Sequence, residues 1–102
     1  MELNTGERLA LLDALPNEGN FTTLKILRKL RESLSFSEQE HKDLNFVVED
    51  NRVAWDETKD RPKDIVIGEK ANDIIVESLK RLNANNKLTD SHFEIYEKFV
   101  GE

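Results

Sequence analysis

Two helices are predicted in the N-terminal third of the chain from the spacing of apolar residues. Leucines recur at three- and four-residue intervals over residues 7–15. Asn4 and Glu7 have the spacing of a capping box, and Pro16 ends the helix. A second helix is expected over residues 22–34, with Ile26, Leu27, Leu30 and Leu34 on one arc. The opposite arc carries a cationic stripe formed by Lys25, Arg28, Lys29 and Arg31.

A short third helix and a β-hairpin follow. Ser37 and Glu40 form a second capping-box pattern, which opens a helix that ends at Leu44. The period then changes from 3.6 to 2, and residues 46–55 are predicted to form a hairpin around Asp50-Asn51. A two-residue loop sets Glu49 opposite Arg52, Val48 opposite Val53, and Phe46 opposite Trp55.

The C-terminal half begins with a charged loop at residues 56–63, six of whose eight side chains are charged. Residues 64–67 are expected to be a short strand or an extended entry into a helix over residues 69–83. A last helix starts at Thr89, its N-cap. We expect Phe93, Tyr96, Phe99 and Val100 to form its buried stripe, and Phe46, Phe93 and Phe99 to be core residues.

These elements predict one domain over residues 1–102, of the α+β class and mostly helical. Residues 5–55 hold three helices and a hairpin, an order that resembles a winged helix. After the charged loop, residues 64–100 form a C-terminal helical hairpin, and Trp55 is expected near the junction of the two parts.

Composition narrows the class of protein. The chain has 102 residues, 37% of them hydrophobic, which suffices for a core. It carries 15 basic and 21 acidic residues, a net charge of −6. The absence of cysteine excludes disulfide scaffolds, cysteine zinc sites and thiol nucleophiles. No signal peptide or spanning segment is recognisable, so we expect a soluble cytoplasmic protein without membrane contact.

Candidate catalytic and metal-binding residues are few. Asp90-Ser91-His92 has the residue types of a catalytic triad, but consecutive helical residues point about 100° apart, so a helix N-terminus is the favoured interpretation. Glu38 and His41 have a ligand spacing found in helical di-iron sites, but the motif occurs once, and such sites need two copies. No glycine-rich phosphate loop is present. We therefore expect no enzyme activity, no cofactor and no metal.

Two groups of residues are candidates for contact with a partner. The cationic stripe of Lys25, Arg28, Lys29 and Arg31 is either a solvated face that balances nearby acids or a docking patch for an acidic partner, protein or nucleic acid. Trp55 and Tyr96 are candidate interface aromatics, because each combines a large ring with a polar group.

DNA binding is an alternative that the element order suggests and the charge pattern opposes. The third helix would enter the major groove, yet it carries Glu38, Glu40 and Asp43. The hairpin tip is also acidic, at Glu49 and Asp50. A third hypothesis is an acidic inhibitor that mimics DNA, but the cations interspersed among the acidic residues argue against it.

The C-terminal half also suggests a source. The run Lys63-Asp64-Ile65-Val66-Ile67-Gly68-Glu69, followed by Lys87-Leu88-Thr89 and Tyr96-Glu97-Lys98-Phe99, resembles small uncharacterised proteins of bacteriophages and prophages. The resemblance covers about 40 residues and implies a small accessory protein with no specified activity. The sequence therefore predicts a non-enzymatic interaction or regulatory module with an unidentified protein partner and self-association as an option. A winged-helix-like DNA-binding transcriptional regulator is the alternative.

Overall fold

The structure is a computed structural model that describes residues 1–50 and 52–101. Its radius of gyration, 13.8 Å, is that of one compact unit of this length. The elements in chain order are β1 (Glu2–Leu3), α1 (Thr5–Ala14), α2 (Phe21–Leu34), α3 (Glu38–Leu44), β2 (Val47–Glu49), β3 (Arg52–Ala54), the 3₁₀ turn η1 (Glu57–Lys59), β4 (Lys63–Asp64), α4 (Glu69–Ala84) and α5 (Asp90–Phe99). The prediction of a mostly helical α+β fold is confirmed.

Helix starts follow the predicted caps closely. Both capping boxes, Asn4 with Glu7 and Ser37 with Glu40, are formed. α2 begins one residue earlier than expected because the side chain of Asn20 accepts a hydrogen bond from the Thr23 N–H. Local side-chain chemistry therefore sets where these helices start.

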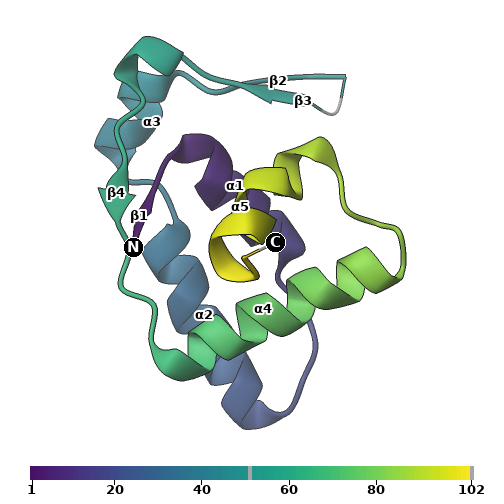
Figure 1. The fold of residues 1–102 in the computed structure, drawn as a ribbon. Helices are drawn as coiled ribbons and strands as arrows, with labels where there is room; N and C mark the ends of the chain where they lie inside the picture. The colour runs from purple at the N-terminus through teal and green to yellow at the C-terminus, as the bar shows by residue number, and fades with distance from the viewer. Residues whose placement is uncertain (51, 102) are drawn as a thin grey trace.

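The core lies between α1, α2, α4 and α5. α1 packs most extensively on α5, so the first and last helices meet at the centre of the molecule (Figure 1). Leu11, Leu27, Ile75, Leu79 and Ile95 are fully buried there. Burial of such side chains contributes about 1.5–3 kcal/mol each, so the packing of these four helices stabilises the fold.

A small sheet joins the N-terminus to the middle of the chain. β1 pairs antiparallel with β4, with Glu2 opposite Asp64 and Leu3 opposite Lys63. The predicted extended segment at residues 64–67 thus begins as a strand, one residue early. Its partner was not predicted, because a two-residue strand shows no period.

The predicted hairpin is present in the predicted register. Val47 lies opposite Ala54, Val48 opposite Val53, and Glu49 opposite Arg52. The predicted turn residue Asn51 lies outside the described residues. We call β2 and β3 the arm, because they extend away from the helices at the top of Figure 1 and every residue of both strands is exposed.

The arm is attached through an aromatic cluster. Phe46, at its base, lies edge-on to Phe36 at 5.1 Å and to His41 at 5.5 Å between ring centres, and 6.4 Å from Trp55. Phe46 is half-buried here, outside the main helical core. These aromatic contacts fix the position of the arm relative to the helices.

The three N-terminal helices follow the expected order, but a winged-helix arrangement is not confirmed. Within the described chain, α3 packs mainly against η1. Leu44, its one buried residue, is not part of the main core cluster. The helix that would enter a DNA groove therefore lies outside the four-helix core.

The predicted buried stripe of α5 is wrong at one position. Phe93 is 64% exposed, and the buried residues of this helix are His92 and Ile95. Tyr96, Phe99 and Val100 are partly buried against the core, as expected. α1 covers the side of α5 that carries His92 and Ile95. These two side chains are therefore buried, and Phe93 faces solvent.

Candidate functional site

The exposed side of α2 combines apolar and cationic residues. Phe21 is 76% exposed and Leu24 is 40% exposed. Lys25 and Arg28 are exposed beside them, and the Lys25 ammonium lies 5.6 Å from the centre of the Phe21 ring. That distance permits a cation–π contact. We call these four residues the α2 face, and they border a shallow groove of about 500 Å³.

The other two cations of the predicted stripe have different surroundings. Arg31 is half-buried and donates hydrogen bonds to the Pro16 carbonyl oxygen at 2.7 Å and to Asn17 Oδ1 at 3.1 Å. It therefore holds the turn between α1 and α2. Lys29 borders a separate groove beside Val66. Lys29 is therefore separated from the other three cations. Lys25 and Arg28 are exposed, whereas the half-buried Arg31 and the acid Glu32 border the same groove.

Sequence reasoning missed Phe21 and Leu24 as parts of this surface, although the signal was present. With 3.6 residues per turn and Leu24 at 0°, Phe21 falls at about 60° and Arg28 at about 40°. The buried residues of α2 fall between about 200° and 300°. An apolar residue on the cationic side of an amphipathic helix indicates a contact surface.

A second concave surface lies between the arm, α1 and the start of α5. It is a cleft of about 710 Å³ with four acidic residues and one cation, Arg52, in its lining. The four acids are Glu7, Asp13, Asp90 and Glu94. We call it the acidic cleft. Its apolar lining comes from Leu9 and Ala10 on one side and Val53 and Trp55 on the other.

The two candidate aromatics differ in position. Trp55 is half-buried in the acidic cleft, next to Gly6, and its buried Nε1 has no hydrogen-bond partner among the described residues. Tyr96 lies against the core, and its hydroxyl oxygen accepts a hydrogen bond from Asn83 Nδ2 at 3.3 Å. Only Trp55 belongs to a concave surface.

His92 has the partners of a catalytic histidine but is arranged as a helix cap. Its Nε2 lies 3.2 Å from Asp13 Oδ2, and its Nδ1 lies 3.3 Å from Thr89 Oγ1. The Thr89 backbone N–H also donates to Nδ1, at 3.1 Å, which makes Nε2 the protonated nitrogen. Because the single lone pair of Nδ1 is occupied by this N–H, it is not available to accept the proton of a hydroxyl nucleophile.

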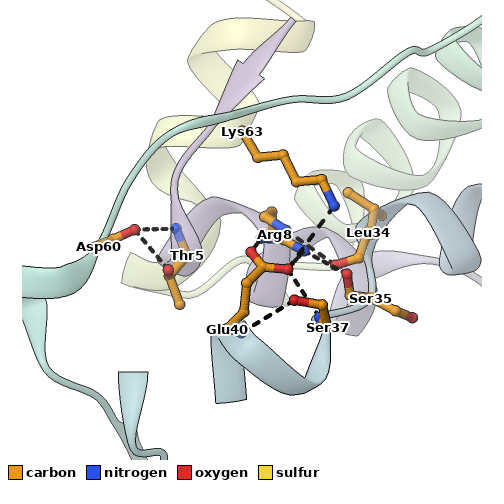
Figure 2. Close-up of polar contacts among 8 residues, drawn as sticks. All are labelled: Thr5, Arg8, Leu34, Ser35, Ser37, Glu40, Asp60 and Lys63. Atoms are coloured by element: carbon orange, nitrogen blue, oxygen red, sulfur yellow. Dashed lines mark hydrogen bonds and ion pairs between the residues drawn. The ribbon is translucent and has the colours of Figure 1, made fainter. Parts of the chain in front are cut away.

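The carboxylate with the most altered acidity belongs to an internal ion pair. Arg8 is 1% exposed, and its guanidinium donates to Glu40 and to the carbonyl oxygens of Leu34 and Ser35 (Figure 2). Hydrogen bonding to Arg8 is the main cause that lowers the pKa of Glu40 to about 2. The pair joins α1 to α3, so its role is to hold the fold. A buried arginine was not foreseen.

The same close-up shows how the charged loop is attached. Asp60 accepts hydrogen bonds from the Thr5 N–H at 3.1 Å and from the Thr5 hydroxyl at 2.7 Å. These two hydrogen bonds attach the loop to the first residue of α1. The N-terminal part of α1 is therefore held both by Asp60 and by the ion pair between Arg8 and Glu40.

Metal-ligating side chains do not gather in the described chain: residues 1–50 and 52–101 contain no cluster of three or more of them. Glu38 and His41 share α3, but His41 lies in the aromatic cluster. Among the helices of the same residues, none has the length and apolar character needed to cross a bilayer.

Comparison with protein-family models, with curated proteins and with solved structures finds no significant match for this chain. The resemblance to small phage and prophage proteins therefore stays a prediction.

Proposed function

We propose that this protein is an acidic, cytoplasmic, non-enzymatic interaction module that binds an acidic segment of a partner protein through the α2 face. The observation that carries the proposal is Phe21, a large aromatic ring left 76% exposed among cations. Exposed aromatic residues beside arginine are typical of the centres of protein interfaces.

The energetics favour a contact that is partly apolar and partly electrostatic. Covering an exposed phenylalanine or leucine side chain stabilises a complex by about 1.5–3 kcal/mol before the costs of association. Lys25 and Arg28 attract acidic groups and set the direction of approach, which mainly raises the association rate and the specificity. The best-fitting partner therefore offers carboxylates around one or two apolar side chains.

An acidic polypeptide fits this surface better than DNA does. Duplex DNA offers regularly spaced phosphates, and its binding depends on several clustered cations. The α2 face has two exposed cations, Lys25 and Arg28, beside the apolar Phe21 and Leu24, and the acid Glu32 borders the same groove. α3, the helix that would enter a DNA groove, carries Glu38 and Asp43 on its exposed surface, where they would repel phosphates.

The proposal is tested by selecting peptides from a random display library on the wild-type protein. Peptides that bind the variant Lys25→Glu/Arg28→Glu equally well are removed. We expect the remaining peptides to share acidic residues around a leucine, isoleucine or aromatic residue. A matched control, Lys80→Glu/Arg81→Glu, reverses two exposed charges on α4 and should keep full binding.

Two outcomes would count against the proposal. One is a selection in which no peptide survives the removal step, or in which the surviving peptides share no acidic consensus. The other is a tight shift of duplex DNA at physiological salt that this variant abolishes, which would identify the α2 face as a nucleic-acid contact.

A further inference from the structure

We propose that a second copy of this chain supplies the acidic partner: the α2 face of one molecule docks in the acidic cleft of another. This inference rests on the proposed function, because it names the occupant of the same α2 face. It also assigns a role to the cleft beneath the arm, which the proposed function leaves unused.

The charges of the two surfaces are complementary. The α2 face presents Lys25 and Arg28 to solvent. In the cleft, Glu7 is compensated by an ion pair with Lys98 at 2.7 Å and is 6% exposed, so it contributes little to the field outside. Asp13, Asp90 and Glu94 are exposed and face the opening from two helices.

The apolar groups also match. Phe21 and Leu24 border the same groove as the cations of the α2 face, and Trp55 and Val53 line the cleft together with its acids. The cleft, at about 710 Å³, is within the range of sites that enclose a ligand of several side chains. The cleft therefore has room for a phenylalanine and a leucine side chain.

The two surfaces are separated within one molecule. Phe21 begins α2, whose first turn lies at the bottom of Figure 1, whereas the arm over the cleft lies at the top. One chain cannot bring its own α2 face to its own cleft, so the complementary charges remain available to a second copy. The net charge of −6 opposes association at long range, but salt near physiological strength screens charges beyond about 8 Å and preserves the local contacts.

The first experiment measures the mass of the purified chain by sedimentation over a wide range of concentrations. We expect the average mass to rise with concentration for the wild type. Two variants should each weaken association at least about tenfold: Lys25→Glu/Arg28→Glu in the face and Asp90→Asn/Glu94→Lys in the cleft. The matched control for the cleft, Asp73→Asn/Glu77→Lys, changes the net charge equally at exposed positions on α4 and should keep the wild-type behaviour.

The decisive step mixes the two deficient variants. The face variant still has a cleft, and the cleft variant still has a face, so their equimolar mixture should form a 1:1 complex although neither variant associates alone. Trp55 is the single tryptophan of the chain and lies in the cleft, so its emission should change on mixing. Circular dichroism of each variant establishes that both are folded.

Failure of this inference is distinguishable from failure of the proposed function. If the mixture stays monomeric with unchanged Trp55 emission while acidic peptides still bind the α2 face, the partner is another protein and the inference is overturned. A wild-type chain that remains monomeric at about 1 mM would overturn it as well, because such an association would be weaker than about 4 kcal/mol.

Discussion

Replacing Glu40 with glutamine tests how far one ion pair holds the N-terminal half together. The carboxylate is the only charged partner within bonding distance of Arg8 among the described residues, and Arg8 is 1% exposed. Glutamine keeps the length of the side chain, but its single amide oxygen cannot replace both carboxylate oxygens, one of which accepts from the Ser37 N–H and the other from Arg8 Nη1. The substitution therefore removes the charge and one of these two hydrogen bonds.

The expected loss can be worked from two directions. The fall of the Glu40 pKa to about 2, from an ordinary value of about 4.3, corresponds to roughly 3 kcal/mol. Because the side chain is 27% exposed, solvent screening reduces this figure to about 2 kcal/mol. Removing one partner of a buried pair costs about 3–5 kcal/mol, but Arg8 keeps its bonds to the Leu34 and Ser35 carbonyl oxygens. We expect a loss of about 2–3 kcal/mol, or roughly 10–15 °C in Tm.

The pH dependence has a definite sign. The pKa of Glu40 is lowered in the folded state, so its contribution is complete above the unfolded pKa of about 4.3 and is lost as the pH falls towards 2. The difference in stability between wild type and Glu40→Gln should be constant from about pH 5 to 8 and should shrink between about pH 4.5 and 2.

Urea unfolding of both proteins at several pH values measures this difference directly. Glu38→Gln is the matched control, since it removes an exposed carboxylate from the same helix and should change stability by less than about 1 kcal/mol. Equal unfolding free energies for wild type and Glu40→Gln at pH 7, or a difference that does not depend on pH, would refute the reasoning.

The remaining predictions concern α5. Ile95→Ala should cost about 2–5 kcal/mol in unfolding free energy, since the side chain is fully buried, whereas Phe93→Ala should cost less than about 1 kcal/mol; similar losses in thermal unfolding would disprove the observed rotation of this helix. His92→Ala should cost about 2 kcal/mol, because it removes both a buried ring and the acceptor of the Thr89 N–H. Asp13→Asn should change stability by less than about 1 kcal/mol, because the side chain is 78% exposed and the amide oxygen can still accept from His92; a larger loss in chemical unfolding would show that the cap depends on the Asp13 charge.

Much of the local structure could be predicted because its causes lie within a few residues. The capping boxes at Asn4 and Ser37 and the hairpin register around Val48 and Val53 depend on short-range chemistry, and the structure has them as predicted. The cationic stripe was likewise visible in the helical period of α2.

What could not be predicted depends on which distant elements meet. Arg8 lies on a helix whose leucines indicate a core face, and its burial requires the turn after α2 to close over it. Phe93 was assigned to the core because its spacing with Tyr96, Phe99 and Val100 follows the helical period, but the position of α1 decides which side of α5 is covered. The pairing of Leu3 with Lys63 joins segments about 60 residues apart, beyond any local pattern.

The most direct test of the central claim is photo-crosslinking from the α2 face. A phenylalanine analogue with a photoreactive group replaces Phe21, and the matched control carries it at Val66, which is 85% exposed and lies outside both the α2 face and the acidic cleft. At concentrations where the chain associates, we predict several-fold more adduct between copies from position 21 than from position 66. Mass spectrometry should map that adduct to the cleft segments around Asp13 and Asp90. Equal yields from the two positions, or adducts from position 21 that map elsewhere, would contradict the account.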